Sequence, residues 1–243
     1  MGPQHWWPAE SAFEVVVGAY LTQNTAWTNV ERAMGNLRQA GVLSIFGIRD
    51  TSLAELEQLV RPAGYFRQKA ARLKRFVAHL DERYSGSLEA MFRQPAEALR
   101  EELLGLPGIG PETADSILLY GANYEVFVVD TYTRRILERH GMAKPETGYE
   151  EIRLAVQKAL ADEEIAKPQQ DGPSKPLARI VTHEPSAASQ MERSELARRY
   201  NEMHALIVQT AKHFCVKGTP KCEYCPLREM LGKRIPAKSS IHK

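Results

Sequence analysis

The 243-residue sequence has few cysteines, no long apolar run and almost no net charge. Its three cysteines all lie between 215 and 225, and this odd number does not suit the disulfide framework of a secreted protein. No apolar run approaches the length of a membrane span, and no basic-then-apolar signal peptide begins the chain. We therefore expect an intracellular protein with no membrane partner.

The formal charge of +2 is too small to act as a global field, so an anionic partner would have to meet local basic patches. One patch is 61–75, RPAGYFRQKAARLKR, which holds six arginines and lysines and no acid. Another begins at Lys212 and continues toward the C-terminus. Taken alone, either patch is equally well explained as a solvated helix face.

Apolar residues recur at helical spacing through most of the chain, and the sequence has no convincing alternating strand pattern. The predicted fold class is therefore all-α. Between about 164 and 191 the composition becomes polar and proline-rich, which predicts a flexible insertion. Helical spacing returns at 193–214. The other predicted helices are 12–21, 30–40, 53–59, 68–80, 96–104, 113–120 and 133–139.

The segment LPGIG (106–110) predicts a tight turn whose backbone N–H groups point outward together. Pro111 suits the first turn of a following helix, and a helix N-terminus behind such a turn can hold a phosphate. Predicted helices on both sides make this segment a helix-hairpin-helix, although alone it could be an ordinary glycine-capped joint. Asp130, before Thr-Tyr-Thr, predicts a helix N-cap.

Five blocks occur in one order: LTQNT at 21–25, RPAGYFRQKAARL at 61–73, LPGIGPETAD at 106–115, VVDTYTRR at 128–135 and HFCVKGTPKCEYCPL at 213–227. Together they resemble the helix-hairpin-helix (HhH-GPD) DNA glycosylases of the endonuclease III superfamily, in which a Gly/Pro-rich segment precedes an essential aspartate. The resemblance covers most of the chain and implies a base-excision-repair enzyme. Its partner would be double-stranded DNA containing damaged bases. We expect a monomer in the cytoplasm, or on the nucleoid in a prokaryote.

The resemblance also implies a two-lobed fold. One helical lobe, with the hairpin and the Gly/Pro-Asp motif, would span 24–139. The second would combine 1–23 with 140–243, and would contain the insertion at 164–191 and a cysteine loop at 215–231. The damaged base would bind between the two lobes.

Glu112 separates this chain from the bifunctional members of the superfamily. In those members the matching position carries a lysine that attacks the sugar C1′ and opens the strand through a Schiff base. A carboxylate cannot form that imine, so the resemblance implies a monofunctional enzyme without AP lyase activity. Water would expel the base with the help of Asp130, and we expect Asp130 and Glu112 to be the catalytic residues.

The N-terminal WWPAESAFEVVVGAYLTQNT is most similar to the 3-methyladenine DNA glycosylase III group. In that group tandem tryptophans help to form the base pocket, which implies that Trp6 and Trp7 recognise the lesion. Alkylated purines carry positive charge on the ring, and an indole face attracts a cation. The alternative is that both tryptophans form a hydrophobic plug between the N-terminus and the core.

A glycosylase must extrude the damaged nucleotide and fill the gap that it leaves. The resemblance gives Gln23, next to Asn24 in LTQNT, the wedge position, and gives Tyr65 a second wedge that supports the partner base. Otherwise Gln23 could cap a helix and Tyr65 could simply pack. Lys69 and its basic neighbours would contact phosphates. Asn24 is a further expected DNA contact, and those in the hairpin are Leu106, Gly108 and Gly110.

Cys215, Cys222 and Cys225 resemble the first three ligands of the family's [4Fe–4S] loop, but Leu231 occupies the fourth position. Four thiolates normally hold such a cluster. A cluster with another fourth ligand, a zinc site using His213 or His242, and a loop without metal all stay open. The helix before the loop also departs from the 3-methyladenine group, because Leu206 replaces a lysine.

Two alternatives to an alkylpurine glycosylase therefore stay open. One is an oxidised-pyrimidine glycosylase/AP lyase of the endonuclease III type, whose lyase step Glu112 argues against. The other is a catalytically silent protein that binds DNA structures, which the incomplete cysteine motif would suit.

Overall fold

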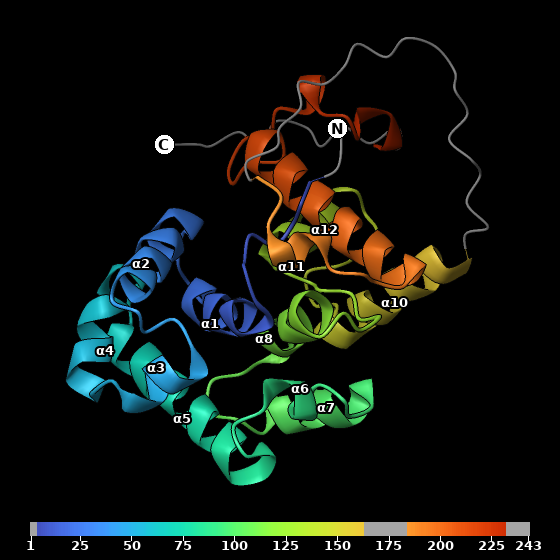
Figure 1. Cartoon of the computed structure of the whole chain (residues 1–243). Helices are drawn as coiled ribbons and strands as arrows, with labels where there is room; N and C mark the ends of the chain where they lie inside the picture. Colours follow the sequence, from blue (N-terminus) through green and yellow to red (C-terminus); the bar gives the residue numbers. More distant parts are fainter. Residues whose placement is uncertain (1–3, 163–183, 232–243) are drawn as a thin grey trace.

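The computed structural model describes residues 4–162 and 184–231, and every regular element within these ranges is helical (Figure 1). The all-α prediction is confirmed for this part of the chain. The α-helices are α1 (Ala12–Thr22), α2 (Trp27–Gln39), α3 (Ile45–Asp50), α4 (Leu53–Leu59), α5 (Phe66–Tyr84), α6 (Leu88–Met91), α7 (Ala96–Leu104), α8 (Pro111–Ser116), α9 (Thr131–Arg139), α10 (Tyr149–Asp162), α11 (Ala187–Gln190) and α12 (Glu195–His213). The short turns are η1 (Arg61–Ala63), the π-helical η2 (Ile117–Gly121), η3 (Cys222–Tyr224) and η4 (Arg228–Met230). None of the described helices combines the length and apolar character that a membrane span requires.

Serine side chains begin several of these helices. Ser44, Ser52, Ser87 and Ser194 each accept a hydrogen bond from the backbone N–H three residues further on. These bonds satisfy donors that a helix N-terminus otherwise leaves without a partner, so the short polar joints in the sequence fix where the helices start.

Buried apolar side chains form two main cores. Helices α1 to α8 build the first, and most buried residues of α1 belong to it. The second joins Trp6 and Trp7 to η2, the segment 127–129, α10 and α12. In Figure 1, α10 to α12 gather at one end of the molecule and α2 to α5 at the other, with α1 and α8 between them. Most buried residues of α1 therefore pack in the first core, while the division into lobes at 24–139 and at 1–23 with 140–243 stays a prediction.

The predicted flexible insertion at 164–191 lies largely within 163–183, outside the described residues. Its last part is the short helix α11, which is tied to the N-terminal segment. The Ser186 hydroxyl donates to the carbonyl of Trp7 at 3.1 Å and accepts from the N–H of Ala9 at 3.2 Å. The prediction was wrong for this last part, because composition does not reveal such long-range hydrogen bonds.

Candidate active site

The predicted helix-hairpin-helix is present, with α7 and α8 on either side of a tight turn. Gly108 has a φ of +81°, and a Cβ there would lie 2.1 Å from Nε of Arg72, so both the turn and the close approach require glycine. Gly110 differs, because its φ is −100° and a Cβ there would meet no atom of the described chain within 4 Å. The surface beside Gly110 is therefore open.

Asp130 follows the segment 126–129 and caps α9, as predicted. Its Oδ1 accepts a hydrogen bond from the N–H of Thr133 at 2.7 Å, and its side chain is 12% exposed. Burial acts to raise its pKa, but the charge of His204 and the hydrogen bonds to the carboxylate outweigh burial and hold the pKa below its ordinary value. Asp130 is therefore ionised at neutral pH.

His204, on α12, is a buried residue that the sequence analysis did not identify. Its Nε2 lies 3.5 Å from Oδ2 of Asp130, and its Nδ1 shares a hydrogen bond with the hydroxyl of Tyr120. Tyr120 belongs to η2, and π-helical distortions of this kind occur frequently at functional sites. The sequence held no local signal for His204, because Leu206, where the family resemblance places a lysine, is two positions further along the helix and does not share a face with it.

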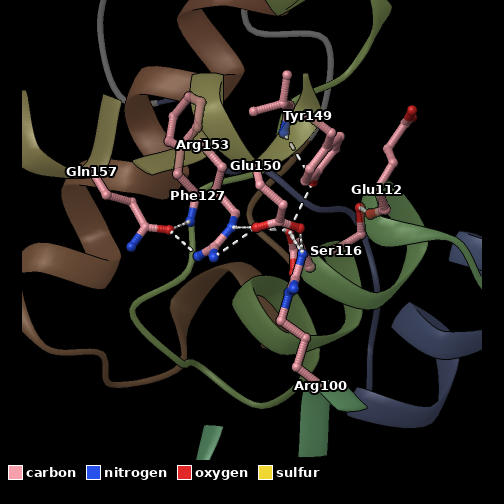
Figure 2. Close-up of polar contacts among 10 residues, drawn as sticks. Arg100, Glu112, Ser116, Phe127, Tyr149, Glu150, Arg153 and Gln157 are labelled. Carbon is pink, nitrogen blue, oxygen red and sulfur yellow. Dashed lines mark hydrogen bonds and ion pairs between the residues drawn. The ribbon is translucent and has the colours of Figure 1, made fainter. Parts of the chain in front are cut away.

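Glu112 occupies the first turn of α8, and its side chain extends away from the polar network around Arg100 (Figure 2). The residue is exposed to solvent, yet its carboxyl group has a pKa raised to about 7. Desolvation by the surrounding protein is the main cause and the charge of Asp130 the second, while His204 opposes them. Glu112 and Asp130 are thus near enough for their charges to interact.

Trp7 is a core residue. Its ring packs against Trp27 and Tyr120, with ring centroids 5.2 and 5.1 Å apart, and its side chain is buried. This packing is what the hydrophobic-plug alternative predicts.

Trp6 is also buried but borders the residues around Asp130. Its ring lies 6.5 Å from that of His204, edge to face, and the ammonium group of Lys212 sits 5.7 Å above the Trp6 ring centroid. Burial lowers the pKa of Lys212, an effect that the charge of Asp130 partly opposes. The ammonium group of Lys212 therefore occupies the face of Trp6 that was predicted to contact the lesion.

The prediction that Lys69 contacts phosphates is wrong. Lys69 is 1% exposed, and its ammonium group donates to the carbonyls of Leu21 and Ala63 at 2.9 and 2.8 Å and to Oγ1 of Thr25 at 3.2 Å. Burial, with the nearby charge of Arg72, lowers its pKa to about 8. Lys69 joins the end of α1 to η1 and cannot reach DNA from this position.

Gln23 is used inside the protein as well. Its amide nitrogen donates to the carbonyl of Gly108 at 2.8 Å and to Oγ1 of Thr113 at 3.0 Å, and its amide oxygen accepts from Arg72 at 2.8 Å. A wedge residue must instead enter the DNA, so Gln23 would have to break these bonds. The hydrogen bonds of Gln23 and Lys69 connect three of the matched sequence blocks, 21–25, 61–73 and 106–115.

Tyr65 and Asn24 belong to two of these blocks, and both residues are exposed. Tyr65 is 67% exposed at the start of α5, and both residues have left-handed backbone conformations, with φ of +46° and +51°. An exposed aromatic side chain on a loop suits the predicted wedge. Leu106 is buried in the first core, so only its backbone is left to meet a partner.

The cysteine loop follows α12 directly. Cys215 is buried and its sulfur accepts a hydrogen bond from Arg139 at 3.3 Å, whereas Cys222 and Cys225 are half-buried. The donor set does not match a four-thiolate cluster, because the fourth position holds the apolar Leu231. Within residues 4–162 and 184–231 no group of three or more His, Cys, Asp or Glu is placed to hold a metal ion, and His242 lies outside these ranges. The metal content stays a prediction.

An all-α fold with a glycine-rich hairpin, and with an ionised aspartate at the start of a later helix, is the arrangement expected of a helix-hairpin-helix DNA glycosylase. The family model described as HhH-GPD superfamily base excision DNA repair protein matches residues 17–162. The chain belongs to this superfamily as a DNA repair glycosylase.

Individual relatives agree with this assignment. A proposed DNA repair glycosylase of Methanocaldococcus jannaschii is 40% identical over 231 residues, covering 94% of this chain and 89% of the relative. Endonuclease III of Thermotoga maritima is 32% identical over 151 residues, covering 62% and 66%. The structure of H. pylori 3-methyladenine DNA glycosylase bound to 1,N6-ethenoadenine superimposes with a TM-score of 0.65 at 27% identity, covering 89% and 91%.

Proposed function

We propose that this protein is a monofunctional DNA glycosylase, which hydrolyses the N-glycosidic bond of a damaged base extruded from double-stranded DNA. The observation that carries the proposal is Glu112 at the first turn of α8, close enough to Asp130 for their charges to interact. A carboxylate at this position cannot form the Schiff base that strand cleavage needs, so water is the nucleophile.

The two carboxyl groups suit different steps of this hydrolysis. Cleavage of a glycosidic bond develops positive charge on the sugar, which the ionised Asp130 would stabilise while it orients water. The environment pushes the two pKa values apart, with Glu112 at about 7 and Asp130 below its ordinary value. Such a separation assigns the acid and the charged partner, so Glu112 is the candidate proton donor for a leaving base that is not already cationic.

The lesion class we propose is the alkylated purine. The similarity to a 3-methyladenine DNA glycosylase supports it, and so do the two interacting carboxyl groups of Glu112 and Asp130, whose negative charge favours a cationic base. Lys212 opposes this assignment, because its ammonium group already lies over Trp6. A cationic base must displace Lys212 or bind elsewhere, whereas a neutral base need not.

A panel of duplexes, each with one alkylated, deaminated or oxidised base, tests both parts of the proposal. We expect free base to be released and the strand to break only after alkali treatment, with alkylated purines released fastest. Faster release of a neutral base would overturn the lesion class. Binding without release of any base would identify a DNA-structure-binding protein instead.

Borohydride trapping tests the absence of a lyase step. We expect no covalent protein–DNA adduct from the natural protein, and a weak one from Glu112→Lys, which restores an amine at this position. Lys212→Met serves as the control, because Lys212 is an amine whose charge interacts with Asp130. An adduct formed by the natural protein and lost in Lys212→Met would show a bifunctional enzyme with its nucleophile on α12.

A further inference from the structure

The segment 126–129, which leads to Asp130, is buried and belongs to no helix or strand of the described structure. Buried backbone N–H groups need partners, and here side chains of α10 supply them. The N–H of Phe127 donates to Oε1 of Gln157 at 3.1 Å, and the N–H of Val129 donates to the hydroxyl of Tyr149 at 3.3 Å. Two side chains of α10 thus act as hydrogen-bond acceptors for the backbone of this segment.

Tyr149 is itself held by a buried carboxylate. Its hydroxyl donates to Oδ2 of Asp115 at 2.8 Å, and Asp115 is fully buried. A buried carboxylate is costly unless charge and hydrogen bonds compensate it, and Arg100 donates to both of its oxygens, at 2.6 and 3.2 Å. Asp115 lies on α8, one turn after Glu112, so the network starts from the same helix as the candidate proton donor.

Charged residues of α10 close the network at its outer side (Figure 2). Glu150 pairs with Arg100, and Arg153 donates to Glu150 at 2.8 Å. Arg153 also donates to Oε1 of Gln157 at 2.8 Å, the same oxygen that accepts from Phe127. Both acceptors for the segment 126–129 therefore belong to one connected set of hydrogen bonds.

We propose that Tyr149, held by Asp115, is a positioning residue that fixes the backbone carrying Asp130. The inference rests on the proposed role of Asp130 in base excision. The hydroxyl of Tyr149 donates one hydrogen bond and accepts another, and phenylalanine can do neither. Burial and Asp115 raise the pKa of Tyr149, which keeps the hydroxyl protonated. Val129 directly precedes Asp130, so a shift of this backbone moves the carboxylate.

Tyr149→Phe tests the proposal, with Tyr124→Phe as the matched control. The Tyr124 hydroxyl also has two hydrogen-bond partners, but both are backbone carbonyls, of Phe92 and Gln94, that share its one proton, and the residue lies outside this network. We expect Tyr149→Phe to lower kcat about tenfold without weakening DNA binding, because small displacements of a catalytic group cost rate and not affinity. Tyr124→Phe should keep kcat, whatever thermal stability it loses.

A double-mutant cycle with Asp130→Asn separates positioning from general destabilisation. We expect Tyr149→Phe to cost almost nothing further in that background, because the charged group to be positioned is gone. An equal loss in both backgrounds, or an equal kcat loss in Tyr124→Phe, would overturn the proposal.

Amide exchange gives a readout independent of the reaction. In Tyr149→Phe the N–H of Val129 should exchange faster, while that of Phe127, which bonds to Gln157, keeps its protection. Unchanged exchange at Val129 would overturn the positioning role. Failure of the natural protein to release any base would instead refute the proposed function, and the exchange result would still decide the inference.

Discussion

At the scale of single residues, the Asp130 carboxyl group combines a structural and a chemical contact. One oxygen caps α9 through Thr133, and the other faces His204 at 3.5 Å. Asparagine caps a helix as well as aspartate does, but it carries no charge. We expect Asp130→Asn to keep its thermal stability and DNA affinity while excision slows on the order of 100-fold, measured by single-turnover kinetics. An unchanged rate would leave Asp130 only as a helix cap.

The raised pKa of Glu112 predicts how the rate of base excision depends on pH. If the leaving base needs a proton, excision should fall as the pH rises through about 7, where Glu112 loses its proton, and Glu112→Gln should abolish that transition. A cationic alkylated base leaves without protonation, so its excision profile should be flat in this range. Rates for the two kinds of lesion, measured from below to above this pH, check both statements.

The same shift affects folding stability. Because the folded-state pKa of Glu112 lies above the ordinary 4.5, protonation contributes stability that is fully present below 4.5 and is lost as the pH rises to about 7. Thermal unfolding of Glu112→Gln, which cannot titrate, provides the reference for this loss.

Sequence motifs indicated candidate site residues, but they did not indicate whether a side chain turns toward the surface or toward the protein interior. Motif position alone predicted Asp130 and Glu112 as catalytic residues, and these roles stay a prediction. Lys69 was misassigned because a basic helix face does not show which amine turns inward to bind carbonyls. His204 was missed because its partner Tyr120 lies 84 positions away in sequence.

At the scale of elements, the two hairpin glycines provide a matched test of the phosphate site. Gly110→Ala should fold normally, since its Cβ meets only open space, and should weaken binding to damaged and undamaged DNA alike if a phosphate lies there. Gly108→Ala should lose thermal stability as well, because its φ is positive and Arg72 fills the space. Gly35→Ala, another glycine with open space, is the control for both. Unchanged affinity in Gly110→Ala would remove the hairpin from the DNA interface.

The helices themselves were largely predictable. Periodicity gave 53–59 and 96–104 with the same bounds as α4 and α7. The prediction missed α10, although Ile152, Val156 and Leu160 recur at helical spacing within it.

At the scale of the whole molecule, sequence patterns could not show how the two cores share the chain. The lobe boundaries were predicted from family resemblance, whereas packing assigns most of α1 to the first core and the N-terminal tryptophans to the second. Contacts between residues far apart in the sequence determine this arrangement, and the spacing of apolar residues along a helix does not reveal them.

The pairing of His204 with Asp130 joins a residue from 184–231 to one from 4–162. A site assembled in this way does not depend on a peptide connection between the two stretches. Two co-expressed fragments, one ending after α10 and the other beginning before α11, would regain turnover only by associating. Base release would then depend on the concentrations of both fragments. If each fragment were fused to another protein, base release would report whether the two fused proteins are close together.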